Sequence, residues 1–387
     1  MKISEVINKQ IKGLWGTDFS DIENGTPVIK TNNMTYEGVI DYSDICYRNI
    51  RKDTIGDNYL QKGDLLVEKS GGTKTHSVGY VNFFDGDNDI FACNNFIIGL
   101  RPNNEIVDSK YLFYQLRYMY ECGYFSDCYN KTTGIQNLKA NQYLGKNIRV
   151  ECKNRQKSIA DELDGIVEAI NLKRKEVSFL DELVKSRFIE MFGDPRTNSK
   201  KLPELTLPEL GEFGRGVSKH RPRNAPELLG GRYPLIQTGE VANAELYINE
   251  YTNTYSELGY KQSKMWKAGT LCITIAANIA KTGILSFDAC FPDSVVGFLA
   301  NEKTNNIFIH FWFSFFQEIL EAQAPASAQK NINLRILREL KVIVPPIELQ
   351  NEFAEFVKLT DKSKFIVQKQ IEDLQELLDS KMDEYFG

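Results

Sequence analysis

The sequence predicts an α+β fold built from two similar halves, each of which ends in one long helix. The segment 156–193 reappears as 350–387 with a constant offset (350 − 156 = 194) and no insertion between the two registers. Both copies carry apolar residues at alternating four- and three-residue spacings, the pattern of helices that pair in a coiled coil. Short apolar runs between Gly, Asn and Asp precede each copy and are typical of irregular sheets. We therefore expect two globules that share one fold.

Length and composition are those of an ordinary soluble protein. With 387 residues, 42% hydrophobic and 11% aromatic, the chain has enough material for two to three domains of about 150 residues. The most apolar window, 307–316, contains a His and a Ser and is too short to span a bilayer. The N-terminal residues are acidic and polar where a signal peptide needs an apolar run. We expect a cytoplasmic protein with no membrane partner.

Residues 1–150 form the first predicted domain. Its short apolar runs lie between turn residues, as the strands of an irregular sheet do. These runs are 27–29, 63–67, 79–81 and 95–98. A helix is predicted over 109–121, because Leu112, Leu116 and either Met119 or Tyr120 fall on one of its faces. The domain is expected to be α+β and rich in loops.

Residues 151–193 contain the first long helix, and residues 346–387 contain the second. A helix of about 36 residues is about 54 Å long, which exceeds the width of a small domain, so each needs a partner and the other copy supplies one. The predicted seam comprises Ile159, Leu163, Ile166, Ile170, Val177, Leu180 and Val184 in the first copy and Phe353, Val357, Val367, Ile371, Leu374 and Leu378 in the second. Thr360 and Lys364 weaken the second seam near its middle. Gly193 followed by Pro195 ends the first helix.

Residues 194–345 form the second predicted domain, and its skeleton repeats that of the first. Segment 234–241 corresponds to 27–34, 268–273 to 62–67, and 310–316 to 110–116. The residues between these matched positions differ almost completely. A duplicated active site would keep its chemical residues in both copies or clearly lose them from one. The divergence therefore favours a duplicated binding module whose two copies have different specificities.

No constellation in the sequence indicates catalysis or a metal. The histidines at 76, 220 and 310 lie far apart, and the seven cysteines show no CxxC pair or metal-ligand spacing. We expect His310, within an aromatic run, to be a core or boundary residue. Asp64 and Glu68 come nearest to a nuclease carboxylate pair, and we interpret them as a solvated strand end. We therefore expect no catalytic residue, no metal and no cofactor.

Local basic segments are the candidates for DNA contact, although the net charge of −5 and the pI near 5.6 do not themselves indicate nucleic-acid binding. Segment 214–223 places four positive charges and a His in ten residues, among glycines that let the backbone approach a partner. Arg can clamp phosphates or bind guanine through two hydrogen bonds, and Asn or Gln can do the same with adenine. The candidate DNA-binding residues are Lys69, Thr73, Lys74, His76, Thr133, Gln136, Asn137 and Lys139 in the first half, and Arg215, Lys219, His220, Arg221, Arg223, Thr238, Asn278, Lys281, Lys330 and Asn331 in the second.

Three longer stretches carry a family resemblance. They are 185–195 (KSRFIEMFGDP) at the end of the first long helix, 221–241 at the opening of the second domain, and 344–350 (VPPIELQ) at the entry to the last helix. In this order they resemble the specificity subunit of a type I restriction-modification system, over essentially the whole chain. The entry to the first helix, 150–156, departs from the pattern because it lacks the Pro-Pro of the second.

This resemblance implies two α/β target recognition domains with pseudo-two-fold symmetry, separated by two long antiparallel helices in a coiled coil. Each domain would read one half of a split site in double-stranded DNA. The helices would act as a spacer and dock two methyltransferase subunits. Adenine methylation and restriction would belong to those subunits and to restriction/translocase subunits. Two alternatives from other classes stay open: a coiled-coil scaffold with two protein-binding modules, and a stand-alone DNA endonuclease.

Overall fold

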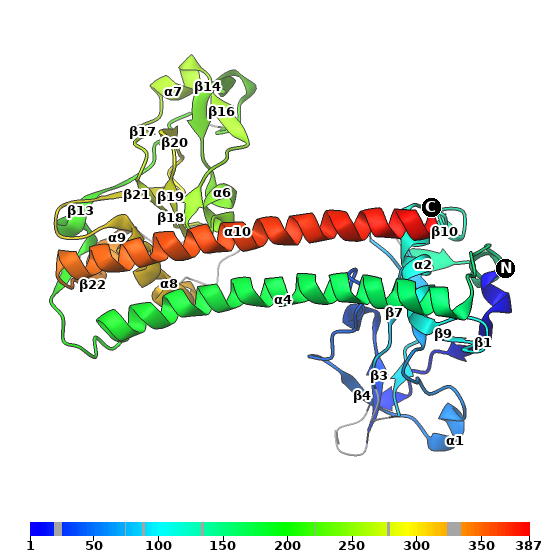
Figure 1. The fold of residues 1–387 in the computed structure, drawn as a ribbon. Coiled ribbons are helices and arrows are strands. Elements are labelled where there is room, and N and C mark those ends of the chain that lie inside the picture. The colour runs from blue at the N-terminus through cyan, green and yellow to red at the C-terminus, as the bar shows by residue number, and fades with distance from the viewer. Residues whose placement is uncertain are drawn as a thin grey trace. The chain divides into compact units, whose positions relative to one another are not determined.

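The computed structural model describes residues 1–18, 25–73, 75–86, 90–132, 135–220, 222–276, 279–322 and 334–387 (Figure 1). They form two compact units: the first unit is Met1–Lys173 with Gln370–Gly387, and the second unit is Arg174–Lys369. The helices α4 (Lys153–Phe192) and α10 (Ile347–Phe386) each contribute one segment to each unit. Each unit therefore consists of a globular part and a pair of helix segments.

The globular part of the first unit is built on a sheet with the strand order β1-β9-β5-β7. These strands are β1 (Ile7–Lys12), β9 (Ile97–Pro102), β5 (Leu65–Glu68) and β7 (Val81–Phe83). A second sheet, in the order β2-β4-β3-β8, consists of β2 (Thr17–Asp18), β4 (Cys46–Asn49), β3 (Thr26–Ile29) and β8 (Ala92–Cys93). The helical elements are η1 (Ile3–Glu5), η2 (Thr31–Asn33), α1 (Lys52–Ile55), α2 (Ser109–Glu121) and α3 (Ala140–Leu144). Helix α2 starts where the Asp108 side chain accepts hydrogen bonds from the backbone N–H groups of Lys110 and Tyr111.

The second unit repeats this topology. Its main sheet has the order β13-β21-β18-β19-β15, with β13 (Gly211–Arg215), β21 (Val295–Ala300), β18 (Leu271–Thr274), β19 (Thr282–Leu285) and β15 (Tyr247–Ile248). A second sheet has the order β16-β14-β20-β17, with β16 (Asn253–Tyr255), β14 (Leu229–Leu235), β20 (Ala289–Cys290) and β17 (Met265–Trp266). Strands β12 (Glu204–Thr206) and β22 (Lys341–Ile343) form a separate pair. The helical elements are α5 (Leu207–Leu210), η3 (Pro226–Leu228), α6 (Thr238–Asn243), α7 (Glu257–Lys261), α8 (Asn306–Ala322) and α9 (Leu334–Glu339).

Matching strand pairs confirm the predicted duplication. Strand β3 pairs with β8 in parallel and with β4 antiparallel, and β14 pairs with β20 and β16 in the same two ways. The predicted helix 109–121 has the bounds of α2. Strand β7 begins at Val81, two residues after the predicted 79, because Gly79 lies in a turn with a φ of 101°. His310, on α8, is buried at 8% exposure, which confirms its predicted place in the core.

The two long helices pair in an antiparallel arrangement within each unit (Figure 1). In the first unit the Tyr385 hydroxyl donates to Glu162 Oε2 at 2.6 Å, and in the second Arg187 Nη2 lies 3.0 Å from Glu352 Oε1. Every residue of the predicted seam is buried or half-buried. The two polar residues near the middle of the second seam are Thr360 and Lys364. Thr360 is buried, and Lys364 makes ion pairs with Asp181 and Glu245. The predicted fold class, α+β with two long paired helices, is confirmed.

The ends of the two helices pack in equivalent ways on their globular parts. Phe386 meets Tyr111 of α2 edge-on at a centroid distance of 5.3 Å, and Phe192, 194 residues earlier, meets Phe308 of α8 at 5.1 Å. Gly193 adopts a φ of 77° and donates its N–H to Ile189 O, which ends α4 as predicted. Among the described residues, no helix has both the length and the apolarity needed to cross a membrane.

Candidate nucleic-acid interface

In the first unit, two predicted DNA-binding segments lie on one small sheet. Strand β6 (Ser70–Gly71) pairs with β11 (Ile135–Leu138), which pairs with β10 (Tyr129–Thr132), all antiparallel. The register places Asn137 opposite Ser70 and Gln136 opposite Gly71. The described residues of segment 69–76 therefore lie next to the paired strands β10 and β11, and together they form one surface. The predicted residues Lys74 and Thr133 lie outside the described residues.

Asn137 presents an exposed amide that a neighbouring hydroxyl orients. It is exposed, and its Oδ1 accepts a hydrogen bond from the Ser70 hydroxyl at 2.6 Å. That bond orients the amide while one oxygen lone pair and the NH₂ group stay available. Lys69 is exposed and Lys139 half-buried near the same strand pair, and their backbones are held by the N–H···O bonds Leu138–Lys69 and Lys139–Cys128. The sheet thus carries an oriented amide with two amines beside it.

Gln136 is engaged within the protein at both ends of its amide. Its Oε1 accepts from the Val78 N–H at 3.2 Å, and its Nε2 donates to Thr73 O at 3.4 Å. The side chain also fills the space beside Gly72, where a Cβ would come within 3.0 Å of it. Gln136 therefore ties the hairpin to the turn that follows β6.

The turn 73–76 is held by its own side chains. Thr73 Oγ1 accepts from the N–H groups of Thr75 and His76, at 3.3 and 3.0 Å. The His76 ring stacks on Tyr36, with a centroid distance of 3.7 Å and an interplanar angle of 17°. Tyr36 is 44% exposed, so the turn presents an aromatic face beside the small sheet. Sequence reasoning missed Tyr36, since a lone tyrosine after a turn carries no signal of its own.

A buried carboxyl group lies beneath this turn. Glu68, the last residue of β5, is 6% exposed, and its Oε1 accepts from the Gly72 N–H at 3.3 Å. Burial raises the pKa of Glu68 to about 7, and the hydrogen bond from Gly72 partly opposes the shift. The expectation that Glu68 sits at a solvated strand end is therefore wrong, because the strand delivers it into the interior.

The two carboxyl groups that suggested a nuclease pair are engaged separately. Asp64 is buried and binds Arg101 through both oxygens, at 2.9 and 2.8 Å, so it too is not solvated. Asp64 is thus bonded to Arg101 and Glu68 to the Gly72 N–H, so the two carboxyl groups have separate partners. Among the residues that the structure describes, no group of three His, Cys, Asp or Glu side chains is arranged to hold a metal ion. These contacts give the stand-alone endonuclease hypothesis no support.

In the second unit, the basic segment leaves strand β13 as an anchored loop. Arg215 ends the strand and is exposed, as is Lys219. The Gln262 Oε1 accepts from the backbone N–H groups of Lys219 and His220, at 2.5 and 3.0 Å. The Ser263 hydroxyl donates to Val217 O at 2.7 Å. The backbone at Val217, Lys219 and His220 is therefore fixed, while the side chains of Arg215 and Lys219 are exposed.

Arg223 and Thr238, both predicted to contact DNA, line one cavity of about 320 Å³. Its other polar lining includes Gln237, Asn224 and Ser294, and its apolar lining includes Tyr255. Arg223 forms an ion pair with Asp293 that leaves its side chain 43% exposed. A pocket of this kind combines a guanidinium, two amides and an aromatic wall. Gln237 directly precedes the predicted Thr238, and the sequence pattern does not indicate that it lines the same cavity.

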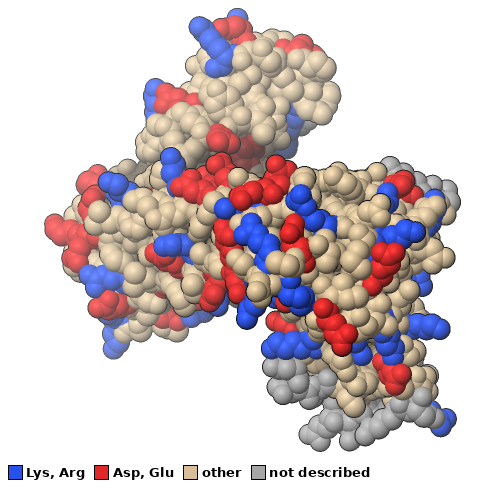
Figure 2. Space-filling view, turned by 45° about the vertical axis from the view of Figure 1, so that its right-hand side comes forward, with Lys and Arg blue, Asp and Glu red and all other residues tan. Residues whose placement is uncertain are grey.

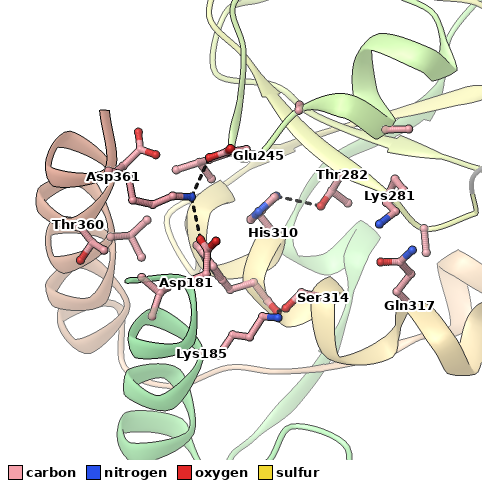
Figure 3. A pocket seen from close by; sticks show the side chains of 18 residues that line it. Asp181, Lys185, Glu245, Lys281, Thr282, His310, Ser314, Gln317, Thr360 and Asp361 are labelled. Carbon is pink, nitrogen blue, oxygen red and sulfur yellow. Dashed lines mark hydrogen bonds and ion pairs between the residues drawn. The ribbon is translucent and has the colours of Figure 1, made fainter. Parts of the chain in front are cut away.

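The other predicted residues of the second unit are dispersed. Lys281 lines a different cavity, beside His310 and Gln317 (Figure 3). His220 lies 3.6 Å from Glu227. Arg221, Asn278, Lys330 and Asn331 fall outside the described residues. On the face shown in Figure 2, acidic and basic side chains are interspersed, in keeping with the negative net charge. This face does not single out a surface by its charge, so the candidate residues are judged by their local side-chain geometry.

The repeated fold and its paired helices are those of a protein built from two similar modules, and the two modules carry unlike polar surfaces. The family model for the type I restriction modification DNA specificity domain matches residues 1–178 and 204–376. The chain belongs to this family, with one match in each half of the repeat. It is a specificity subunit and non-catalytic, and the catalytic activities of such systems lie in other subunits.

One curated relative and two solved structures are similar to most or all of this chain. A Methanocaldococcus jannaschii protein with the provisional name type I restriction enzyme MjaX specificity subunit is 22% identical over 367 residues, which cover 91% of this chain and 84% of that protein. The solved S subunit of a type I restriction-modification system from M. genitalium is 17% identical, with a TM-score of 0.57 over 100% of this chain and 95% of its own. A chain from a structural study of the assembly and conformational transition of the type I R-M system is 14% identical, with a TM-score of 0.58 over 99% and 96%. These structures share the fold.

Proposed function

We propose that this chain reads a bipartite site in double-stranded DNA, one half with each globular part. By doing so it directs adenine methylation and restriction by partner subunits. The observation that carries the proposal is the repetition of one topology with two different polar surfaces, within a chain of the specificity family. One fold with unlike surfaces suits two unlike half-sites, because sequence is read by side chains on a scaffold that need not change.

In the first half-site, Asn137 is the proposed base-reading residue. Its amide can accept from adenine N6 and donate to N7, the bidentate pattern that distinguishes adenine in the major groove. Ser70 supports this role because its hydrogen bond limits rotation of the amide before DNA arrives. Lys69 and Lys139 are proposed to hold the flanking phosphates, contacts that position the protein without reading sequence.

In the second half-site, Arg223 is the proposed base-reading residue. A guanidinium has five N–H donors, so an arginine paired with Asp293 keeps donors for guanine O6 and N7. Thr238 and Gln237 line the same cavity and are placed to contact a neighbouring base. The exposed Arg215 and Lys219 are proposed as phosphate contacts, since both side chains reach solvent and the backbone of Lys219 is held by Gln262.

The long helices are the proposed spacer between the half-sites. Each has 40 residues, which corresponds to about 60 Å of α-helix at about 1.5 Å per residue. One turn of DNA is about 34–36 Å long, so such a helix covers between one and two turns. A helical spacer would fix both the distance and the relative rotation of the two reading surfaces.

The same helices carry the proposed docking surface for methyltransferase subunits. In the second unit, large apolar side chains away from the seam face solvent: Phe179 (66% exposed), Leu183 (49%), Leu359 (67%), Phe365 (62%) and Ile366 (51%). Leu359 and Ile366 are seven residues apart and so share one face of α10. Apolar patches on a helix surface are typical of docking sites. The first unit exposes Leu172 and Leu377, so two methyltransferase subunits, one for each unit, are expected.

The test is sequence-specific binding by this chain with its methyltransferase partner. The complex should select one bipartite sequence from random DNA against excess competitor. Arg223→Ala should weaken binding to that sequence by about 1–3 kcal/mol and relax preference at one position of the second half-site only. Binding without sequence preference would refute the proposal, and retention of protein partners without DNA would favour the scaffold alternative.

A further inference from the structure

A cavity of about 480 Å³ lies in the second unit where the globular part meets the two long helices (Figure 3). Lys364 of α10 crosses this space. Its Nζ lies 2.7 Å from Asp181 Oδ1 on α4 and 2.7 Å from Glu245 Oε2, in the segment between α6 and β15. A single amine therefore joins both helices to the globular part.

Lys364 is charged in this setting. Its side chain is 13% exposed, whereas those of Asp181 and Glu245 are 54% and 74% exposed. Burial alone would lower the pKa of the amine, but the hydrogen bonds to the two carboxylates raise that pKa above its ordinary value. Burial also raises the pKa of Asp361, and it lowers that of His310 to about 4, so His310 is neutral near neutral pH. The remaining charged groups of the lining are Lys185 and Lys281.

The first copy of the repeat is built differently at this position. The counterpart of Lys364 is Ile170 (364 − 194 = 170), which is 3% exposed. The counterpart of Asp181 is Gln375, whose amide bonds along its own helix to Asp379 at 3.0 Å. An apolar seam residue is therefore compatible with this fold, and the three-way ion pair belongs to the second unit.

The energetics of such an amine favour a geometric role over a stabilising one. Dehydrating the largely buried ammonium group costs free energy, and two carboxylates that stay more than half exposed repay little of that cost. Apolar replacement of Lys364 is therefore expected to be neutral or stabilising. A polar residue at a seam position in coiled coils instead selects one register at the expense of stability. Lys364 is a polar residue of this kind, and its two partners lie on α4 and on the segment between α6 and β15. Its ion pairs therefore restrain the rotation of the globular part relative to the two helices.

We propose that Lys364 is a positioning residue that holds the second globular part in one orientation on the helix pair and so narrows the half-site spacing that the protein accepts. This inference rests on the proposed bipartite reading. Without the amine, the module would still bind its half-site, because none of the proposed base contacts changes. The range of accepted gap lengths would widen, because only apolar contacts would then hold the globular part on the helices, and these allow it to rotate.

The experiment uses the full chain with its methyltransferase partner and DNA in which the two half-sites are separated by gaps of varied length. Lys364→Met removes the charge and keeps an unbranched side chain. Glu245→Gln removes the charge of the more exposed of the two carboxylate partners and keeps a side chain of the same shape, outside the apolar core. Lys358→Met is the matched control, because it makes the same substitution on the same helix. Among the described ion pairs, Lys358 has one, with Glu355 of α10 itself. The readouts are affinity at each gap and the thermal unfolding midpoint.

We expect Lys364→Met to reduce discrimination against gaps one base pair off by at least about fivefold, the lower end of typical coupling between sites. Glu245→Gln should act in the same direction, Lys364→Arg should restore discrimination, and the Lys358 variant should match wild type. Affinity at the preferred gap and the unfolding midpoint should change little. Unchanged discrimination between gap lengths in Lys364→Met would overturn the inference. A parallel loss of affinity at every gap and of the thermal unfolding midpoint would also overturn it, because that result is expected of a residue with a structural role alone. Absence of any gap preference in the wild type would instead refute the proposed bipartite reading.

Discussion

Replacing Gln350 with Leu tests the joint between the second globular part and its helix. Gln350 is fully buried near the start of α10. Three of its hydrogen bonds are 3.1 Å or shorter: its Oε1 accepts from the Thr304 hydroxyl at 2.7 Å, and its Nε2 donates to the carbonyl oxygens of Lys303 at 3.1 Å and Pro345 at 2.8 Å. A fourth, longer bond comes to Oε1 from the Asn305 N–H at 3.4 Å. Leucine has a similar shape but satisfies none of these groups.

The expected loss is set by the three shorter hydrogen bonds. At a net of about 1 kcal/mol each they give about 3 kcal/mol, and leaving buried groups unpaired adds to that cost. The repeat supplies a second case, Gln156, which is also fully buried. It accepts from the Asp108 N–H at 2.6 Å and donates to Ile106 O at 3.1 Å and Glu151 O at 2.7 Å. Gln156→Leu should therefore cost the first unit a similar amount.

The assay is native-state hydrogen exchange, which reports opening free energies for separate parts of a protein. Amides of β18 and β21 should lose about 3 kcal/mol of protection in Gln350→Leu, the sum of three hydrogen bonds. Gln375→Leu on the same helix is the control, because its amide reaches only Asp379, and it should shift protection by less than about 0.5 kcal/mol. A loss below about 1 kcal/mol in Gln350→Leu, no larger than one average hydrogen bond, would refute this reasoning.

Three other perturbations test the first half-site, a buried acid and the spacer. Asn137→Ala should weaken binding by about 1–3 kcal/mol and relax preference at one position of the first half-site; a uniform loss across sequences would contradict base reading. The pKa of Glu68 rises from 4.5 to about 7 on folding, so its contribution to stability is complete below pH 4.5 and is lost as pH rises through about 7. Glu68→Gln should remove that decline in denaturant unfolding measured across this range, and an unchanged pH profile would show that another group is responsible. Inserting four residues near Ser178, about one helical turn or about 6 Å, should lengthen the recognised gap before either half-site is lost. A binding-competent insertion that kept the original gap would contradict the spacer role.

The fold was predictable because its determinants are periodic. Heptad spacing identified Leu163 and Phe353 as seam residues, and both are fully buried, since side chains at that spacing share one face of a helix. The offset of 194 residues indicated two copies of one topology. Lys364 could be recognised as an interruption, but its partners Asp181 and Glu245 are 183 and 119 residues away in sequence, so only the fold brings them together.

The candidate site was less predictable, because side-chain function there depends on contacts within loops. Gln136 and Asn137 are adjacent and chemically alike, yet one is occupied by Val78 and Thr73 while the other is exposed. A strand alternates its side chains between two faces, and the sequence does not say which face is covered. The same ambiguity applies to Glu68, which the sequence places at a solvated strand end and the structure buries at 6% exposure.

Methylome sequencing of cells that carry the methyltransferase, with and without this chain, tests the central claim most directly. We predict adenine methylation at one bipartite motif, with a fixed gap between its halves, that is present only when this chain is present. Arg223→Ala should alter one half of that motif and Asn137→Ala the other. A methylation pattern that is unaffected by removal of the chain, or a motif without two separable halves, would contradict the account.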